Sequence, residues 1–103
     1  MNRILLIITT ETERKNAEKI SNVLLEKRVA ACISLKEISS TYFWGGNIET
    51  CNEIEISIKS TIENREQIIS ILKANLSNEL PQIIFTEIDS DLDYFNWIKR
   101  SVI

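Results

Sequence analysis

The sequence contains no histidine, and only two glycines and one proline occur among its 103 residues. Without histidine, the chain has no Ser-His or Cys-His nucleophilic pair and no imidazole ligand for a metal. A single pair of glycines also excludes the glycine-rich fingerprints of dinucleotide and P-loop sites. Scarce Gly and Pro argue against long loops or linkers. We therefore expect a chain of mostly regular structure that is not an enzyme.

Long apolar runs and clusters of basic residues are missing as well. The N-terminal apolar run, residues 4–8, is shorter than the about 7–15 residues of a signal peptide and the ~20 residues of a membrane span. The net charge of −3 disfavours binding to phosphate backbones. We therefore expect a cytoplasmic protein that binds neither nucleic acid nor membranes, in which Cys32 and Cys51 are free thiols.

Hydrophobic periodicity divides the chain into strands and helices. Continuous apolar residues predict a strand over 3–9 that is buried on both faces and therefore central, whereas alternating Ile54, Ile56 and Ile58 predict a strand with one packed face. Further strands are expected over 30–44, 48–61 and 82–88. Helices are expected to begin at three capping boxes, Thr10-x-x-Glu13, Ser60-x-x-Glu63 and Ser90-x-x-Asp93. The resulting βαββαβ order with a short C-terminal helix predicts an α+β, ferredoxin-like fold in a single domain, 1–103.

The two middle strands exceed the about 5–6 residues of a typical strand. Gly45-Gly46 is expected to join them in a tight hairpin turn, and a bulge is expected near Lys36-Glu37. Three aromatic residues, Tyr42, Phe43 and Trp44, lie beside this turn. Because one small domain cannot easily bury such a tip, the long hairpin predicts an arm that pairs with other subunits.

Few residues offer binding chemistry. The run 89–93 resembles the start of a calcium loop, but Tyr94 and Arg100 stand where an EF-hand needs Gly and Glu. Cys32 and Cys51 lack metal-site spacing, so Cys32 is interpreted as a small core or interface residue. Lys59 lies on the polar face of its strand, where it is either solvated or the partner of an anion.

The sequence resembles the CutA family of divalent-cation tolerance proteins. The matching pieces keep the family's order along nearly the whole chain: residues 26–33 (EKRVAACI), 42–49 (YFWGGNIE), Glu53, 58–61 (IKST), 79–83 (ELPQI) and 94–98 (YFNWI). The resemblance implies a ferredoxin-like fold and a tight homotrimer held together by the long hairpins. It also implies a role in the response to copper and other divalent metal ions, without an established enzymatic activity.

The family's architecture is similar to that of the PII signalling proteins, which bind small molecules between subunits. The resemblance therefore implies an inter-subunit cleft, in which Lys59 faces a small anionic ligand or a carboxylate. The residues expected to line this cleft are Cys32, Tyr42, Trp44, Glu49 and Lys59. A PII-like small-molecule sensor and a trimeric protein-interaction hub remain alternatives to a role in metal tolerance.

One part of the family pattern is absent from this chain. Family members often have His-Pro-Tyr before the last strand, and Leu76, Ser77 and Asn78 stand at the matching positions. No metal site and no cofactor are therefore predicted. Cys32 is the one soft ligand left for copper, so any copper binding is expected to be weak.

Overall fold

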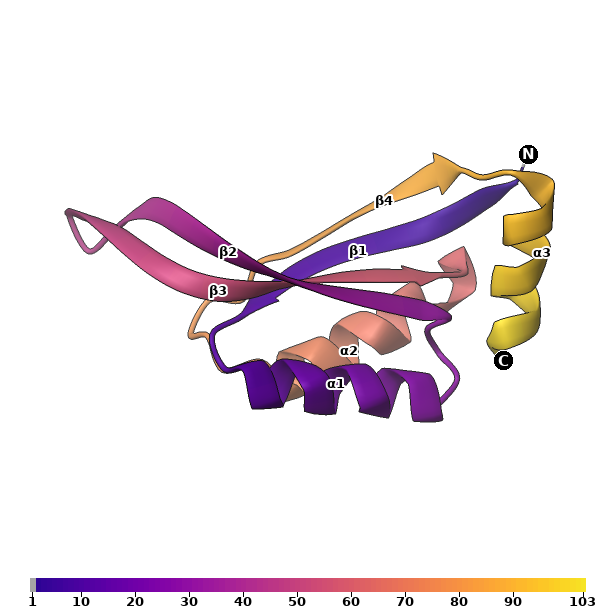
Figure 1. Cartoon of the computed structure of the whole chain (residues 1–103), viewed down its shortest axis with the longest axis horizontal. Coiled ribbons are helices and arrows are strands. Elements are labelled where there is room, and N and C mark those ends of the chain that lie inside the picture. The colour runs from indigo at the N-terminus through magenta and orange to yellow at the C-terminus, as the bar shows by residue number, and fades with distance from the viewer. Residues whose placement is uncertain (1) are drawn as a thin grey trace.

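The computed structural model describes residues 2–103, which form a four-stranded antiparallel sheet with helices packed on it (Figure 1). The strands lie in the order β2-β3-β1-β4, which is the ferredoxin-like arrangement. This confirms the predicted fold class and the central position of the first strand. The elements are β1 Arg3–Glu11, α1 Arg14–Glu26, β2 Cys32–Trp44, β3 Asn47–Ser60, the 3-10 helix η1 Ile62–Asn64, α2 Arg65–Asn75, β4 Ile83–Asp89 and α3 Leu92–Ser101.

The hydrophobic core lies between one face of the sheet and the pair α1 and α2 (Figure 1). Alternate residues of β1 and β3 point toward the helices, because successive side chains of a strand face opposite sides. The buried cluster includes Leu5, Ile7, Ile56 and Ile58 from the strands and Ile20, Leu24, Ile68 and Leu72 from the helices. The opposite face of the sheet, here called the open face, carries α3 at the end where β1 begins (Figure 1).

The end of α1 is fixed by its backbone and by α3. Arg28 has a φ of 58°, and the N–H groups of Arg28 and Val29 donate to the carbonyls of Leu25 and Leu24. This is a Schellman ending in which an arginine occupies the left-handed position that glycine usually takes. The Arg28 guanidinium also donates to the carbonyls of Arg100, at 3.3 Å, and Ser101, at 3.2 Å. One residue thus joins the C-terminal ends of α1 and α3.

The hairpin of β2 and β3 is regular along its whole length. Its register runs without interruption from the Cys32–Lys59 pair to the Trp44–Asn47 pair, so the bulge predicted near Lys36-Glu37 is wrong. The strands twist instead of adding an unpaired residue (Figure 1). Gly45 and Gly46 have φ values of 58° and 83°, as the two-residue turn that best fits twisted strands requires.

Half of this hairpin extends beyond the rest of the sheet. The pairing of β1 with β3 stops at the Glu11–Ile54 pair, so residues 38–53 form a two-stranded ribbon with no third strand. Figure 1 shows this ribbon projecting from the body of the molecule, whose longest extent is 45 Å. Two strands alone are only marginally stable in water.

The helix starts differ from the three predicted capping boxes. Thr10 remains in β1 and pairs with Glu55, so α1 begins four residues later. The Ser60 hydroxyl donates to the carbonyl of Val29 instead of capping a helix. At α3 the cap is Asp91, one residue after the predicted Ser90. Thr10 and Ser60 still pair with neighbouring strands, and this pairing keeps their hydroxyl groups away from the helix starts.

Candidate functional site

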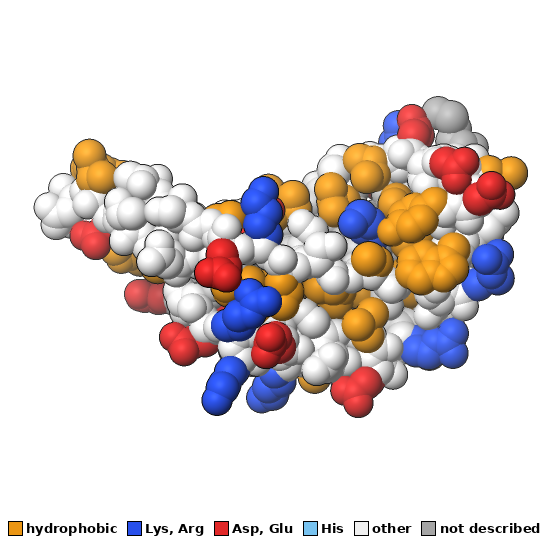
Figure 2. All heavy atoms as spheres, viewed as in Figure 1, with side chains coloured by type: hydrophobic (Ala, Val, Ile, Leu, Met, Phe, Trp, Pro, Cys, Tyr) orange, Lys and Arg blue, Asp and Glu red, His pale blue; other side chains and the backbone are white. Residues whose placement is uncertain are grey.

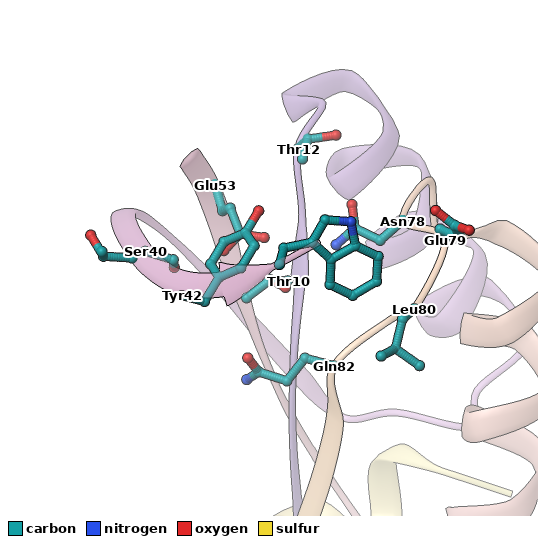
Figure 3. A pocket seen from close by; sticks show the side chains of 11 residues that line it. Thr10, Thr12, Ser40, Tyr42, Glu53, Asn78, Glu79, Leu80 and Gln82 are labelled. Atoms are coloured by element: carbon teal, nitrogen blue, oxygen red, sulfur yellow. The ribbon is translucent and has the colours of Figure 1, made fainter. Parts of the chain in front are cut away.

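A pocket of about 460 Å³ lies between the ribbon and the segment 78–82 that leads into β4 (Figure 3). This volume is within the range of small-molecule sites, about 300–1,000 Å³. The end of β1, both strands of the hairpin and the 78–82 segment all contribute side chains. The lining residues are Thr10, Thr12, Ser40, Thr41, Tyr42, Trp44, Glu53, Asn78, Glu79, Leu80 and Gln82.

One wall of the pocket is aromatic. Tyr42 and Trp44 are two residues apart on β2, and side chains at that spacing lie on the same face of a strand. Their exposed fractions are 43% and 47%. Within one chain, these two large rings therefore lie outside the core.

The charges around the pocket are of one sign. Glu53 and Glu79 belong to its lining, which contains no lysine or arginine. Within the described part of the chain, the ion pairs involve other carboxylates: Glu18, Glu37, Glu66, Glu87 and Asp89. The pKa of the Tyr42 hydroxyl is raised, first by partial burial and then by the nearby Cys51 thiol and the carboxylates of Glu53 and Glu49. The potential inside the pocket is therefore negative.

The segment beside the pocket is held in place by Glu11, the last residue of β1. Its fully buried carboxylate accepts hydrogen bonds from the Ser77 N–H at 2.9 Å, the Glu13 N–H at 3.0 Å and the Asn16 amide at 3.0 Å. Burial alone would raise the pKa of Glu11, but the hydrogen bonds from Ser77, Glu13 and Asn16 outweigh it and lower the pKa. Asn16 also donates to the Asn75 carbonyl at 2.9 Å. This network fixes the chain just before the pocket residues at 78 and 79.

The five residues predicted to line a cleft lie on the open face, but they are not all close together in one chain. Cys32 pairs directly with Lys59, and Tyr42 pairs with Glu49. The pocket brings together Tyr42 and Trp44 only. Cys32 and Lys59 lie ten residues further along the hairpin, about 33 Å away at ~3.3 Å per residue. A cleft with all five residues would need a second subunit and stays a prediction.

Comparison with known proteins decides the family. The family model for the CutA1 divalent ion tolerance protein matches residues 5–101. The chain belongs to the CutA family. The curated CutA of Thermotoga maritima, a divalent-cation tolerance protein, is 32% identical over 101 residues, which cover 97% of this chain and 100% of that one.

Solved structures of CutA proteins share this fold. The protein from Xylella fastidiosa superposes with a TM-score of 0.92 at 34% identity, covering 97% of this chain and 98% of that one. A CutA from Archaeoglobus fulgidus, described as periplasmic, gives a TM-score of 0.92 at 31% identity, covering 97% and 99%. The resemblance read from the sequence is thus confirmed for both family and fold.

In this chain, Cys32 lies beside the aromatic side chain of Tyr94. The Tyr94 hydroxyl lies beside the Cys32 thiol, and the pKa of Tyr94 is raised by burial and then by that thiol. Tyr94 stacks on Trp97 with ring centroids 5.7 Å apart. Among residues 2–103, no three His, Cys, Asp or Glu side chains are grouped closely enough to hold a metal ion. Among the described residues, Cys32 therefore does not belong to a group of three such ligands.

Sequence reasoning missed Glu11, Glu53 and Glu79 as parts of the site. For Glu11 a signal existed, because an acidic residue directly follows a continuous apolar strand. Glu53 and Glu79 belong to the pieces that resemble the CutA family, but a helix separates them in the sequence and only the fold brings them to one pocket.

None of the helices formed by residues 2–103 has the length and hydrophobicity needed to span a bilayer.

Proposed function

We propose that this CutA protein is a non-enzymatic homotrimer that takes part in the cytoplasmic response to copper and other divalent cations. Family membership supports the role in divalent-cation tolerance, since the relatives from Thermotoga maritima and Pectobacterium atrosepticum carry that description. The shape of the hairpin supports the oligomer. Each part of the proposal has its own support and its own test.

The observation that carries the oligomer is the unsupported ribbon. Phe43 and Ile48 are cross-strand partners near its tip, and their exposed fractions are 71% and 74%. An isolated two-stranded ribbon gains stability when a further strand or an apolar surface covers it. The exposed ribbon thus supports the proposal of an oligomer.

The two free edges of the sheet favour a closed ring of subunits over a dimer. β2 and β4 lie at opposite edges of the sheet and present unpaired backbone groups. When two different edges meet, the contact is head-to-tail, and repetition of such a contact gives a ring where the rotation closes and an open filament where it does not. Three copies joined β2 to β4 would leave no open edge.

The open face provides apolar area for the same assembly. A small apolar cleft of about 120 Å³ is lined by Leu6, Ile8, Ile84, Phe85 and Thr86. Ile84 on β4 is 55% exposed. Figure 2 shows further hydrophobic side chains gathered toward the α3 end of the molecule. Burial of this surface would stabilise the trimer by about 25 cal/mol per Å².

Light scattering tests the oligomer directly. Measured at low protein concentration, the molar mass should correspond to three chains of 11.9 kDa. The mass should also hold on dilution, because a large apolar interface dissociates slowly. A monomeric mass across the concentration range would overturn the proposal.

Calorimetry tests the metal role. Because Cys32 belongs to no group of three His, Cys, Asp or Glu side chains within residues 2–103, we expect weak binding of copper to the reduced protein. A tight site with one copper per chain would contradict this expectation. Cys32→Ser serves as the matched variant, and it should abolish whatever copper binding is seen.

A second candidate function, that of a PII-like small-molecule sensor, is favoured by the pocket beside the ribbon. A thermal-shift screen with metals and nucleotides separates the two functions. A large shift with a metal supports tolerance, and a large shift with a nucleotide supports the sensor.

A further inference from the structure

The 78–82 segment is tied to the last residues of β1 at both of its ends. Just before the segment, the Ser77 N–H donates to the Glu11 carboxylate at 2.9 Å. Just after it, Ile83 pairs with Thr9 as β4 begins. Thr9 and Glu11 lie two residues apart on one strand, and both are fully buried. The end of β1 therefore fixes where the segment leaves α2 and where it enters the sheet (Figure 1).

Both oxygens of the Glu11 carboxylate take part in this arrangement. Its Oε1 accepts from the Ser77 N–H and from the Asn16 amide at 3.0 Å, and its Oε2 accepts from the Glu13 N–H at 3.0 Å. Asn16 also donates to the carbonyl of Asn75, the last residue of α2, at 2.9 Å. A side chain without oxygens at position 11 would leave these donors unpaired. Such a change would release the start of the segment from β1.

The segment held in this way carries an apolar side chain that the rest of the chain does not cover. Leu80 is 72% exposed, and Figure 3 shows it projecting from the segment. Tyr42 and Trp44 are exposed nearby on the ribbon, and Ile84 is 55% exposed at the start of β4. Exposed apolar side chains gathered next to an unpaired sheet edge are typical of a surface that another protein covers.

A second copy of this chain is the partner that fits this surface. The surface is continuous with the edge of β4 and with the ribbon, the two features that support the proposed trimer. Leu80 precedes the first residue of β4 by three positions, which is about 10 Å of extended chain. A neighbouring β2 laid along β4 would therefore bring its own subunit against Leu80. The side chains that one chain leaves exposed here are then covered in the assembly.

We propose that Glu11 is a positioning residue for assembly, which fixes the 78–82 segment so that Leu80 packs against a neighbouring subunit. This role rests on the trimer proposed above, and it names the contact within each chain that prepares the trimer surface. Glu11 is fully buried in its own chain, so it acts on the interface only through the segment. Its loss weakens assembly although the residue itself meets no neighbouring subunit.

Subunit exchange between native trimers measures this effect. Unlabelled and isotope-labelled trimers are mixed, and native mass spectrometry follows the appearance of mixed trimers. Glu11→Ala and Leu80→Ala should each exchange about tenfold faster than the wild type, as expected when one important interface contact is lost. The double variant should also exchange about tenfold faster and not more, because both substitutions remove the same contact and their effects do not add. Circular dichroism checks that each variant is folded.

Ser60→Ala is the matched control for a general loss of stability. It removes another buried hydrogen bond, from the Ser60 hydroxyl to the Val29 carbonyl, without touching the 78–82 segment. It should lower the free energy of unfolding but leave the exchange rate unchanged. Glu11→Gln keeps one acceptor oxygen, so it should exchange more slowly than Glu11→Ala, and it replaces that variant in the comparison if Glu11→Ala does not fold.

Two results would overturn the role of Glu11 in a trimeric wild type. The first is equal acceleration of exchange by Ser60→Ala and by the Glu11 variant, which would indicate a general effect of stability. The second is a double variant in which the effects of Glu11 and Leu80 multiply, because Glu11 would then not act through the segment. A monomeric wild type in light scattering would instead overturn the trimer, and this role with it.

Discussion

Glu11 shows how one buried carboxylate organises segments that are far apart in the sequence. It receives N–H groups from the start of α1 and from Ser77, 66 residues later. Among residues 2–103 no cation forms an ion pair with it, so hydrogen bonds stabilise its charge. The same carboxylate therefore supports both the fold and the position of the 78–82 segment at the pocket.

We predict that Glu11→Ala lowers the free energy of unfolding by about 3 kcal/mol, because it leaves buried N–H donors without an acceptor. Urea denaturation at one fixed protein concentration measures this loss. Glu13→Ala is the control, since Glu13 is exposed and its side chain makes no cap hydrogen bond. Equal loss in the two variants would contradict the role assigned to Glu11.

The stabilisation by Glu11 should also depend on pH. Its pKa in the folded protein lies below the ordinary value of 4.5. A group with a lowered pKa contributes stability that is fully present above the unfolded value and is lost as the pH falls through the folded value. The stability difference between wild type and Glu11→Gln should thus be larger at pH 7 than at pH 3. A difference that is constant over this range would show that the charge has no part in it.

Arg28 combines an unfavourable backbone with favourable side-chain contacts. Its left-handed φ of 58° suits glycine, whereas its guanidinium bonds hold the end of α3. We predict that Arg28→Gly and Arg28→Ala both destabilise the fold, but that the Gly variant is more stable than the Ala variant by about 1 kcal/mol. Thermal unfolding of the two variants side by side tests the order, and the reverse order would exclude backbone strain at this position.

At the scale of elements, helix starts were harder to predict from the sequence than strands. Alternation of Ile54, Ile56 and Ile58 predicted β3 correctly, because a half-buried strand imposes a period of two on its residues. Capping boxes failed at Thr10 and Ser60, since both residues still pair at the ends of their strands instead of starting a helix. Tertiary pairing therefore decided where α1 and η1 begin.

The cap of α3 gives a test at the same scale. The Asp91 carboxylate accepts a hydrogen bond from the Tyr94 N–H at 3.0 Å. We predict that Asp91→Ala costs about 1 kcal/mol and lowers the unfolding midpoint by about 4–8 °C. Asp93→Ala, which loses only the interaction with the helix dipole, should cost less. Ser90→Ala should have little effect on stability. If Ser90→Ala and Asp91→Ala lowered the free energy of unfolding equally, Ser90 would be the cap instead of Asp91.

At the scale of the whole molecule, the sequence predicted the long hairpin but not the pocket that it borders. Tyr42 and Trp44 were singled out because aromatic residues at a hairpin tip are hard to bury. Their neighbours Glu79 and Leu80 lie more than thirty residues later, and they meet the ribbon only because the hairpin twists over that segment (Figure 1). Local patterns carry no information about such a meeting, so the lining of the pocket required the structure.

The proposed trimer leads to a prediction about the open face. Ile84 is exposed on the edge strand β4, within the small apolar cleft beside Leu6 and Ile8. Lysine at this position would bring three charges into the buried centre or edges of the trimer, where desolvation is costly. We therefore expect Ile84→Lys to lower the mass measured by light scattering from three chains toward one.

Asn22→Lys is the matched control for this substitution. Asn22 is exposed on α1, on the side of the sheet opposite to the open face, so the same added charge should leave the mass at three chains. Circular dichroism should show that both variants keep the fold, because neither residue belongs to the buried core. If Ile84→Lys remains trimeric while folded, the open face around β4 is not part of the interface, and the ribbon alone must carry the assembly.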